Sequence, residues 1–235
     1  MAQVKFLDLF TGSGGVSGVA IEAGCDVKSL DDCSEGIVSP HGIDFKENIL
    51  NWDYEQVLTE WLPDIIWASP LCTAFSDANC TSGTSRMAQL QCGDAMVDAT
   101  IEIIKFVQLI RLSRGMSPLI YILENPDGAK RMALKNRDVM MQWNSPSIVA
   151  HYCQYGQLWR KPTRFWVAPH MTSLQLRTCP GDERCLAMHF NTQTHKWRHM
   201  KSPGCGMAMY GVQPHLKEKY AVPRELVRLL CGFQS

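Results

Sequence analysis

The chain has 235 residues, 46% hydrophobic and 20% charged, which is ordinary for one soluble globular domain with a full core. No apolar stretch approaches the roughly 20 residues needed to cross a bilayer, and no signal-peptide pattern opens the chain. The formal net charge is zero, yet residues 1–128 carry 7 basic and 18 acidic side chains, and residues 129–235 carry 16 and 5. This split indicates either a basic surface for a polyanion or two solvated faces of one domain. The ten cysteines form no compact framework, so reduced thiols in an intracellular protein are expected.

A strand followed directly by a glycine-rich turn is predicted at the start of the chain. Residues 4–10 are the strand, glycines stand at 12, 14 and 15, and residues 16–21 open a helix. A strand, a glycine loop and a helix N-terminus can bind a nucleotide-like ligand through free N–H groups. The spacing departs from the strict dinucleotide fingerprint, so a purely structural turn is the alternative.

A second strand, residues 27–30, ends in Asp31-Asp32. An acidic side chain about 20 residues beyond a glycine loop can accept hydrogen bonds from a ribose diol. Simple surface acidity would produce the same pattern.

A third strand, residues 64–69, leads through Pro70 and Leu71 to Cys72. Proline fixes its own φ and pushes the residue before it toward extended geometry, so the thiol would lie on a stiff turn at the carboxyl edge of the sheet. Ligands bind at that edge in open α/β sheets. A lone cysteine is more often a small buried hydrophobic residue.

Residues 75–93 are rich in polar residues and glycine, which predicts a long mobile loop directly after the thiol. Apolar residues at helical spacing predict a helix over residues 95–114. The next strand, residues 119–123, delivers Glu124 and Asn125 to the same carboxyl edge. Burial at a strand end favours a protonated carboxyl group that could donate a proton, although a helix-capping role is the commoner one.

Further strands are expected at residues 147–153 and 165–167, with a basic segment, residues 160–164, between them. Residues 168–219 are polar and rich in chain breakers. A zinc site needs four nitrogen or sulfur ligands, and this segment offers Cys179, Cys185, His189 and Cys205. Since there is no C-x-x-C pair, solvated histidines and buried thiols are the alternative. A short amphipathic helix, residues 220–230, ends at Gly232.

Taken in order, these motifs resemble the cytosine C5 DNA methyltransferase family over residues 4–167 and 219–232. Asp8-Leu9-Phe10-Thr11-Gly12-Ser13-Gly14-Gly15 resembles its S-adenosylmethionine (SAM) loop, and Pro70-Leu71-Cys72 its Pro-Pro-Cys motif. Glu124-Asn125-Pro126 resembles its Glu-Asn-Val motif, residues 160–164 its basic motif, and Ala221-Val222-Pro223 its last motif. The resemblance implies an α/β, Rossmann-like sheet with helices on both faces. It divides the chain into a catalytic domain (1–167), a small irregular target-recognition region (168–218) and a returning C-terminal helix (219–235).

The resemblance also implies a covalent mechanism on a cytosine flipped out of the duplex. The Cys72 thiolate adds to C6, protonated Glu124 hydrogen-bonds N3, and C5 then takes the methyl group before a base removes the C5 proton and the thiol leaves. The implied catalytic residues are Cys72, Glu124, Arg160 and Arg164. The implied SAM-binding residues are Asp8, Phe10, Gly12, Gly14, Gly15, Asp32, Asn48, Ile49 and Pro70, and the implied substrate-binding residues are Ser76, Asn125 and Thr163.

Four positions depart from the family pattern. Leu71 stands where the family has the proline before its cysteine, Asn48 replaces an aspartate near the adenine, and Tyr220 replaces an asparagine. The basic motif reads Arg-Lys-Pro-Thr-Arg instead of Gln-x-Arg-x-Arg, so either Arg160 or Arg164 could match.

The predicted function is therefore SAM-dependent C5 methylation of cytosine in double-stranded DNA, with structural zinc as an additional cofactor. The alternatives are methylation of RNA such as tRNA and a catalytically silent SAM- or nucleic-acid-binding relative. The expected location is the cytoplasm of a prokaryotic or virus-infected cell, or a eukaryotic nucleus, with no membrane association.

Overall fold

The computed structural model describes residues 3–34, 36, 39–75, 83–129, 131–200 and 221–234. Its centre is a six-stranded sheet of order β2-β1-β3-β4-β6-β5. The strands are β1 (Lys5–Leu9), β2 (Asp26–Leu30), β3 (Ile65–Ala68), β4 (Ile120–Pro126), β5 (Ser147–His151) and β6 (Pro162–Val167). The first four are parallel, and β6 runs antiparallel to both β4 and β5. The predicted α/β fold is confirmed.

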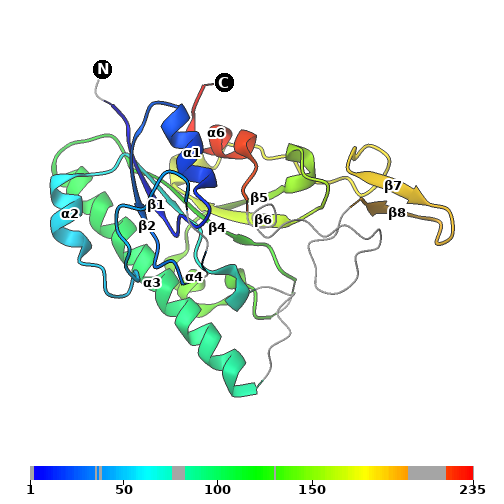
Figure 1. The fold of residues 1–235 in the computed structure, drawn as a ribbon, viewed down its shortest axis with the longest axis horizontal. Helices are drawn as coiled ribbons and strands as arrows, with labels where there is room; N and C mark the ends of the chain where they lie inside the picture. Colours follow the sequence, from blue (N-terminus) through cyan, green and yellow to red (C-terminus); the bar gives the residue numbers. More distant parts are fainter. Residues whose placement is uncertain are drawn as a thin grey trace.

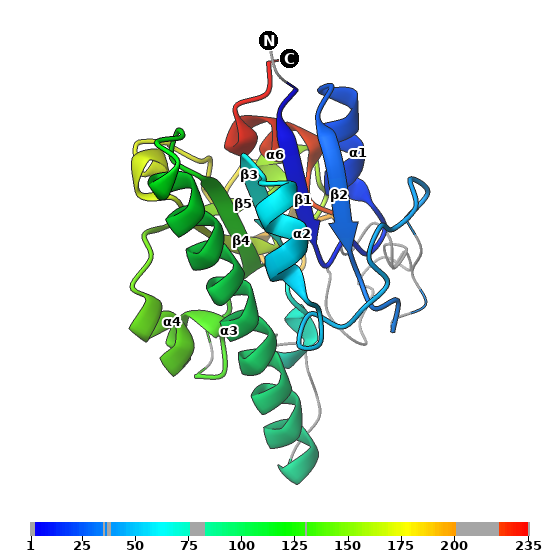
Figure 2. The same ribbon diagram turned by 90° about the vertical axis from the view of Figure 1, so that its left-hand side faces the viewer.

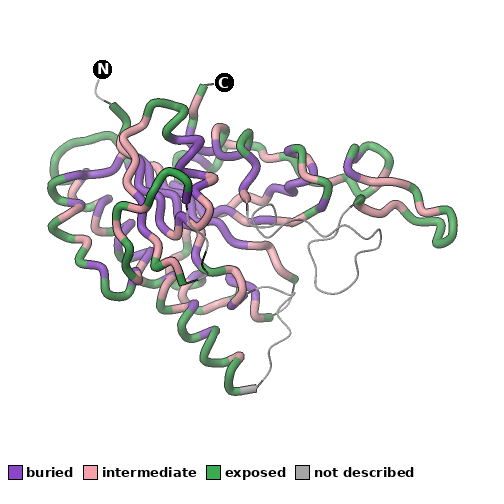
Figure 3. Tube along the Cα trace, in the orientation of Figure 1, coloured by how far each residue is buried: buried purple, intermediate pink, exposed green. Residues whose placement is uncertain are grey.

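Helices cover both faces of this sheet. Figure 1 shows α1 (Gly15–Glu22) beside α6 (Arg224–Cys231), and Figure 2 shows α2 (Tyr54–Glu60), α3 (Gly83–Ser113) and α4 (Asp138–Trp143) in front of the strands. Buried backbone is concentrated in the sheet between these layers (Figure 3). All four residues of β3 are buried, which explains its continuous apolar sequence. The short helices are η1 (Cys72–Ala74), η2 (Leu134–Asn136), η3 (Tyr152–Tyr155) and η4 (Pro169–Met171).

Helix α6 closes the sheet on the α1 side. Leu226, Val227 and Leu230 are buried on one side of it, and Gly232 ends it with a positive φ of 71°. Glu22 of α1 forms ion pairs with Arg224 and Arg228. The expected amphipathic C-terminal helix is confirmed. None of the helices in the described part of the chain combines the length and the apolar character that crossing a bilayer requires.

The prediction of a loop over residues 75–93 was wrong, because α3 begins at Gly83. Leu90 is fully buried and packs with Ala74, Phe75 and Val97, so the apolar face of the helix extends below the predicted start. Gly93, the last residue of the predicted loop, lies within α3 and serves packing. A Cβ at this position would lie 2.8 Å from Ala74 Cβ and from Phe75 Cζ, so glycine lets η1 approach the helix. Residues 76–82 lie outside the described residues.

The region predicted to be irregular contains a β-hairpin. Strands β7 (Met188–Asn191) and β8 (Lys196–His199) form their own two-stranded antiparallel sheet. The hairpin projects away from the six-stranded sheet on the right of Figure 1. Helix α2 also lacked a sequence signal, since it is short and only Leu58 is fully buried along it.

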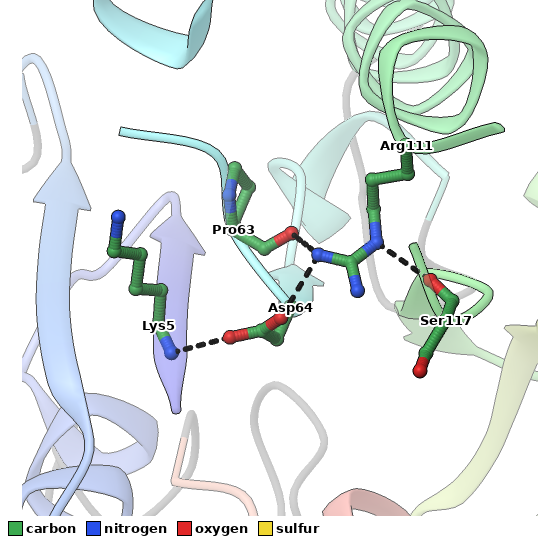
Figure 4. Close-up of polar contacts among 5 residues, drawn as sticks. All are labelled: Lys5, Pro63, Asp64, Arg111 and Ser117. Carbon is green, nitrogen blue, oxygen red and sulfur yellow. Dashed lines mark hydrogen bonds and ion pairs between the residues drawn. The ribbon is translucent and has the colours of Figure 1, made fainter. Parts of the chain in front are cut away.

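A buried arginine joins the amino-terminal ends of the strands (Figure 4). Nη1 of Arg111 donates to the Pro63 carbonyl at 2.8 Å and to Asp64 Oδ1 at 2.9 Å, and Nε donates to the Ser117 carbonyl at 2.9 Å. Asp64 Oδ2 accepts from the backbone N–H of Lys5 at 2.9 Å, where β1 begins. Only 4% of the Arg111 side chain is exposed. This network fixes the end of α3 and the starts of three strands relative to one another.

A buried carboxylate fastens β1 to α1. Asp8 Oδ2 accepts from the backbone N–H of Ser17 at 3.1 Å and from its hydroxyl at 2.5 Å. Asp8 is 1% exposed. Burial raises the pKa of Asp8 from 3.8 to about 6, although the bonds from Ser17 and Thr11 oppose this shift.

The Arg111→Met variant should be less stable than wild type by roughly 2–4 kcal/mol, because the Pro63 and Ser117 carbonyls lose a buried charged donor. Urea unfolding of both proteins measures the difference. Arg114→Met is the matched control: Arg114 is exposed and donates only to the Thr59 carbonyl at 3.3 Å, so its loss should cost less than about 0.5 kcal/mol. Equal losses in both variants would contradict this account of the network.

The Asp8→Asn variant tests the buried carboxylate. Because the pKa of Asp8 is higher in the folded chain, the folded state binds more protons between pH 3.8 and about 6, and this carboxyl group lowers stability as the pH rises through that window. Asparagine does not titrate. The stability of the variant relative to wild type should therefore rise by roughly 2–3 kcal/mol from pH 4 to pH 7. A difference that does not change with pH would show that Asp8 titrates normally.

Candidate functional site

One cleft at the carboxyl ends of β1, β2, β3 and β4 gathers most of the predicted site residues. This is the edge at which open α/β sheets bind ligands. Cys72 and Glu124 both line it, and so do Ala221 and Val222, just before α6. Of the predicted SAM-binding residues, the cleft is lined by Asp8, Phe10, Gly12, Gly15, Asp32, Asn48, Ile49 and Pro70.

The glycine loop forms one wall of the cleft. Phe10 has a φ of 63°, an unusual conformation for a bulky side chain that is often found at functional sites. A Cβ at Gly15 would meet no atom within 4 Å, so this position leaves space. Gly14 lies outside the lining: it caps α1 with a φ of 72°, and a Cβ there would lie 2.3 Å from Ser39 Oγ.

Two adjacent carboxylates at the end of β2 make different contacts. Asp31 holds the loop, since Oδ2 accepts from the Gly12 N–H at 2.8 Å and Oδ1 from the Cys33 N–H at 2.7 Å. Asp32 is exposed, and its Oδ2 accepts from Asn48 Nδ2 at 3.2 Å. Both carboxylates line the cleft. The sequence indicated the binding position of Asp32 and missed the role of Asp31 in fixing the loop.

Cys72 begins the one-turn helix η1 and is partly exposed to the cleft. The residue before it, Leu71, has φ −47° and ψ 104°. Proline prefers a φ of about −65 ± 15°, so Leu71 already has nearly the backbone geometry that proline would impose. The absence of the family's second proline therefore does not displace Cys72.

Glu124 and Asn125 end β4 beside this turn. Asn125 is fully buried, and its Nδ2 donates to the Pro70 carbonyl at 3.1 Å. Glu124 is 6% exposed, and its Oε1 accepts from the Tyr152 hydroxyl at 3.1 Å. Since Tyr152 occupies Oε1, the other oxygen, Oε2, is the position for a proton that Glu124 could donate into the cleft.

The cation in the cleft is Lys161, which the sequence reasoning missed. Its Nζ lies 3.8 Å from Glu124 Oε1 and 4.8 Å from the centre of the Tyr152 ring. Lys161 has a φ of 25°, a strained conformation that directs the chain into β6. The sequence did offer this residue, since Lys161 lies between Arg160 and Arg164, the two candidates for the basic residue of the site.

The two predicted arginines do not line the cleft. Nε of Arg160 donates to His151 Nδ1 at 3.3 Å, and Arg164 binds Asp127 Oδ1 and Ser147 Oγ at 3.0 and 2.7 Å. Arg164 is therefore engaged by Asp127 and Ser147, whereas Lys161 faces Glu124 and Tyr152. Thr163 is fully buried and donates to the Lys161 carbonyl at 3.2 Å, which supports the strained turn.

The structure corrects the predicted metal ligands. Cys153, Cys179, Cys185 and His199 place their ligand atoms within 4.8 Å of one another. His189 is not a member: it pairs across the hairpin with Arg198, whereas His199 pairs with Met188 and therefore points to the other face. Cys205, like Ser76 and Tyr220, lies outside the described residues.

Burial affects the protonation of this Cys/His cluster. It raises the pKa of the Cys153 thiol to about 12 and also raises the pKa of the Cys179 thiol. Burial and the nearby Arg160 guanidinium lower the pKa of His199, which keeps the imidazole neutral at pH 7.

A relative in frog virus 3 matches this chain over most of its length. This protein, described as a "probable DNA (cytosine-5)-methyltransferase", is 27% identical over 206 residues, which cover 86% of the chain and 87% of the viral protein. No protein-family model matches the chain.

Two solved structures have a similar arrangement. The methyltransferase EhMeth of Entamoeba histolytica matches with a TM-score of 0.46 and 13% identity over 76% of this chain. A mutant of DNMT2 from Spodoptera frugiperda matches with a TM-score of 0.43 and 17% identity over 77% of it. The chain spans only 57% and 56% of their lengths. The chain is therefore similar over most of its length to a viral protein described as a probable cytosine C5 methyltransferase, and its ordered motifs resemble those of that family.

Proposed function

We propose that this chain transfers a methyl group from SAM to C5 of cytosine in DNA, through a covalent adduct between Cys72 and C6. The observation that carries the proposal is a single cleft that brings a glycine loop and two carboxylates next to a cysteine and a buried glutamate. These parts come from four strand ends far apart in the sequence, so their convergence depends on the whole fold.

The cleft fits SAM in the chemistry of its walls. The Gly12–Gly15 turn offers close backbone approach, and the open position at Gly15 leaves room for a ligand at the start of α1. Asp32 offers a carboxylate to a ribose diol, and Asn48, bonded to it, forms the neighbouring wall with Ile49. When bound, SAM supplies an electrophilic methyl group on a sulfonium.

The thiolate of Cys72 is the nucleophile. Its addition to C6 of cytosine forms an S–C6 bond and moves the electron pair of the C5–C6 double bond onto C5, conjugated through C4 with N3, which is protonated; C5 thereby becomes nucleophilic. C5 then takes the methyl group, and the sulfonium of the donor leaves as a neutral thioether. Next, the C5 proton passes to a water molecule acting as base, the electrons of the C5–H bond re-form the C5–C6 double bond, the S–C6 bond breaks to release the thiolate, and N3 returns its proton to Glu124.

Glu124 and Lys161 stabilise the electrons that move into the ring. A proton on Glu124 Oε2 can be donated to N3, because the Tyr152 hydroxyl holds the other oxygen. The Lys161 ammonium supplies the positive charge beside this acid that the sequence led us to expect from Arg160 or Arg164.

Double-stranded DNA is the proposed substrate. The viral relative is described as a probable DNA methyltransferase, and the second half of the chain carries an excess of basic residues that would attract a polyanion. RNA is the second candidate, since one branch of this family uses the same motifs on tRNA. A silent SAM-binding relative is the third, and the near-proline geometry of Leu71 argues against it.

Cys72→Ala should abolish transfer of labelled methyl groups to DNA and should prevent covalent trapping on duplexes that contain 5-fluorocytosine, because no thiolate remains to attack C6. SAM binding, measured by calorimetry, should persist. Cys92→Ala is the control, since Cys92 is exposed on α3, and it should trap as wild type does.

Unchanged methylation by Cys72→Ala would overturn the mechanism. Covalent trapping on RNA that contains 5-fluorocytosine, without trapping on the corresponding DNA, would instead show that the substrate is RNA. Binding of SAM by wild type without trapping on either nucleic acid would favour the silent relative.

Lys161→Met should lower kcat roughly 10–100-fold with little change in SAM affinity, because the charge beside Glu124 is lost. Lys161→Arg should recover part of the rate. Lys135→Met is the control: the Lys135 ammonium pairs with Asp127 at 2.8 Å outside the cleft, and its loss should leave kcat nearly unchanged. If Arg160→Met lowers kcat while Lys161→Met does not, the assignment of the cation is wrong.

A further inference from the structure

Four potential metal ligands converge at the base of the β7–β8 hairpin. Cys153 lies in η3, Cys179 and Cys185 lie on the connection between η4 and β7, and His199 ends β8. Cys153 and Cys185 are buried, and Cys179 and His199 are half-buried. These segments come from both the sheet domain and the hairpin, so the cluster lies where the two parts join.

We propose that Cys153, Cys179, Cys185 and His199 bind a structural Zn²⁺ ion. A tetrahedral zinc site with Zn–S bonds near 2.3 Å and Zn–N bonds near 2.0–2.1 Å places its ligand atoms about 3.5–3.8 Å apart. His199 Nε2 lies 3.4 Å from Cys179 Sγ and 3.8 Å from Cys185 Sγ. The four ligand atoms lie within 4.8 Å of one another, so small side-chain rotations would complete the tetrahedron.

The ligand types favour zinc. Three thiolates and one imidazole form a Cys₃His set, which is typical of closed structural zinc sites, whereas Mg²⁺ and Ca²⁺ require oxygen ligands. Gln154 also supports the site. Its Nε2 donates to Cys185 Sγ at 3.3 Å and to Cys153 Sγ at 3.8 Å, and such N–H donors stabilise metal-bound thiolates.

The segment around the cluster has little core of its own to hold it in place. The hydrophobic cluster there has only three buried members, Cys153, Cys185 and Ala187, and two of these are ligands. Leu186 is 90% exposed between them. A small region with so few buried apolar residues commonly needs a metal or a disulfide to fold stably.

The ion would also set the position of the hairpin relative to the candidate site. The backbone N–H of the ligand Cys179 donates to His151 Nδ1 at 2.8 Å. The same ring nitrogen of His151 also accepts from Arg160 Nε. Arg160 directly precedes Lys161 in the cleft. Zinc would therefore hold the hairpin, with Lys196 and Trp197 on β8, at a fixed position beside the segment that carries the cation.

The test is the metal content of full-length protein purified without chelators or polyhistidine tags. Wild type should contain about one zinc per chain by elemental analysis, and His199→Ala and Cys179→Ser should contain far less. The matched control is His189→Ala, on the opposite face of the same hairpin from His199, which should retain full zinc. Co²⁺ substitution should give the absorption of a tetrahedral thiolate complex in wild type and in the control.

Removal of zinc with a chelator should lower the melting temperature and expose the hairpin region, residues 172–200, to limited proteolysis, while SAM binding in the cleft persists. Zinc-free wild type that takes up no added Zn²⁺, a disulfide between two of the three cysteines in freshly purified protein, or equal zinc loss in His189→Ala and His199→Ala would each overturn the proposal. These readouts do not require methyl transfer, so they stand apart from the proposed activity.

Discussion

A single buried hydrogen bond, from Nδ2 of Asn125 to the carbonyl of Pro70, joins the two halves of the candidate site. Cys72 follows the acceptor by two residues, and Glu124 directly precedes the donor. Because β3 and β4 are parallel neighbours, both turns leave the same edge of the sheet, but strand pairing stops at Ala68 and Leu123. Beyond that point, this bond is what sets the distance between the proposed nucleophile and the proposed acid, and Asn125 is fully buried so that water cannot compete for it.

The sheet separates stability from chemistry. At its amino-terminal edge, Arg111 pairs with Asp64 and donates to the Pro63 carbonyl. At its carboxyl edge, several polar groups face a cleft: Asp32 is exposed, and Glu124 has one oxygen bonded to Tyr152. The network at one edge fixes the starts of the strands, and the polar groups at the other edge face the cleft from a framework that is held in place.

The sequence predicted the strands and the cleft well, because both depend on local patterns. Apolar runs followed by Asp31 or Glu124, and the run that leads through Pro70 to Cys72, mark strands and their carboxyl ends without reference to the rest of the fold. Long-range packing decided the rest. The packing of Ala74 against Gly93 has no local signal in the sequence, and Lys161 could not be distinguished from its neighbouring arginines without Tyr152. Cys153 was assigned to a strand, so its partnership with three later residues had no signal in the spacing.

The backbone conformation of Leu71 has a consequence for how the sequence of the Pro70-Leu71-Cys72 motif can vary. Its φ of −47° lies close to the value of about −65 ± 15° that a prolyl ring would impose, so leucine at this position already has nearly the backbone geometry that the second proline of the motif would secure. The side chain at position 71 is then not needed to fix the backbone conformation before Cys72. Leu71 lines the cleft and is 37% exposed, so the side chain at this position can contact a ligand there. A signature defined by two consecutive prolines would overlook this chain, although its motif has nearly the same backbone geometry.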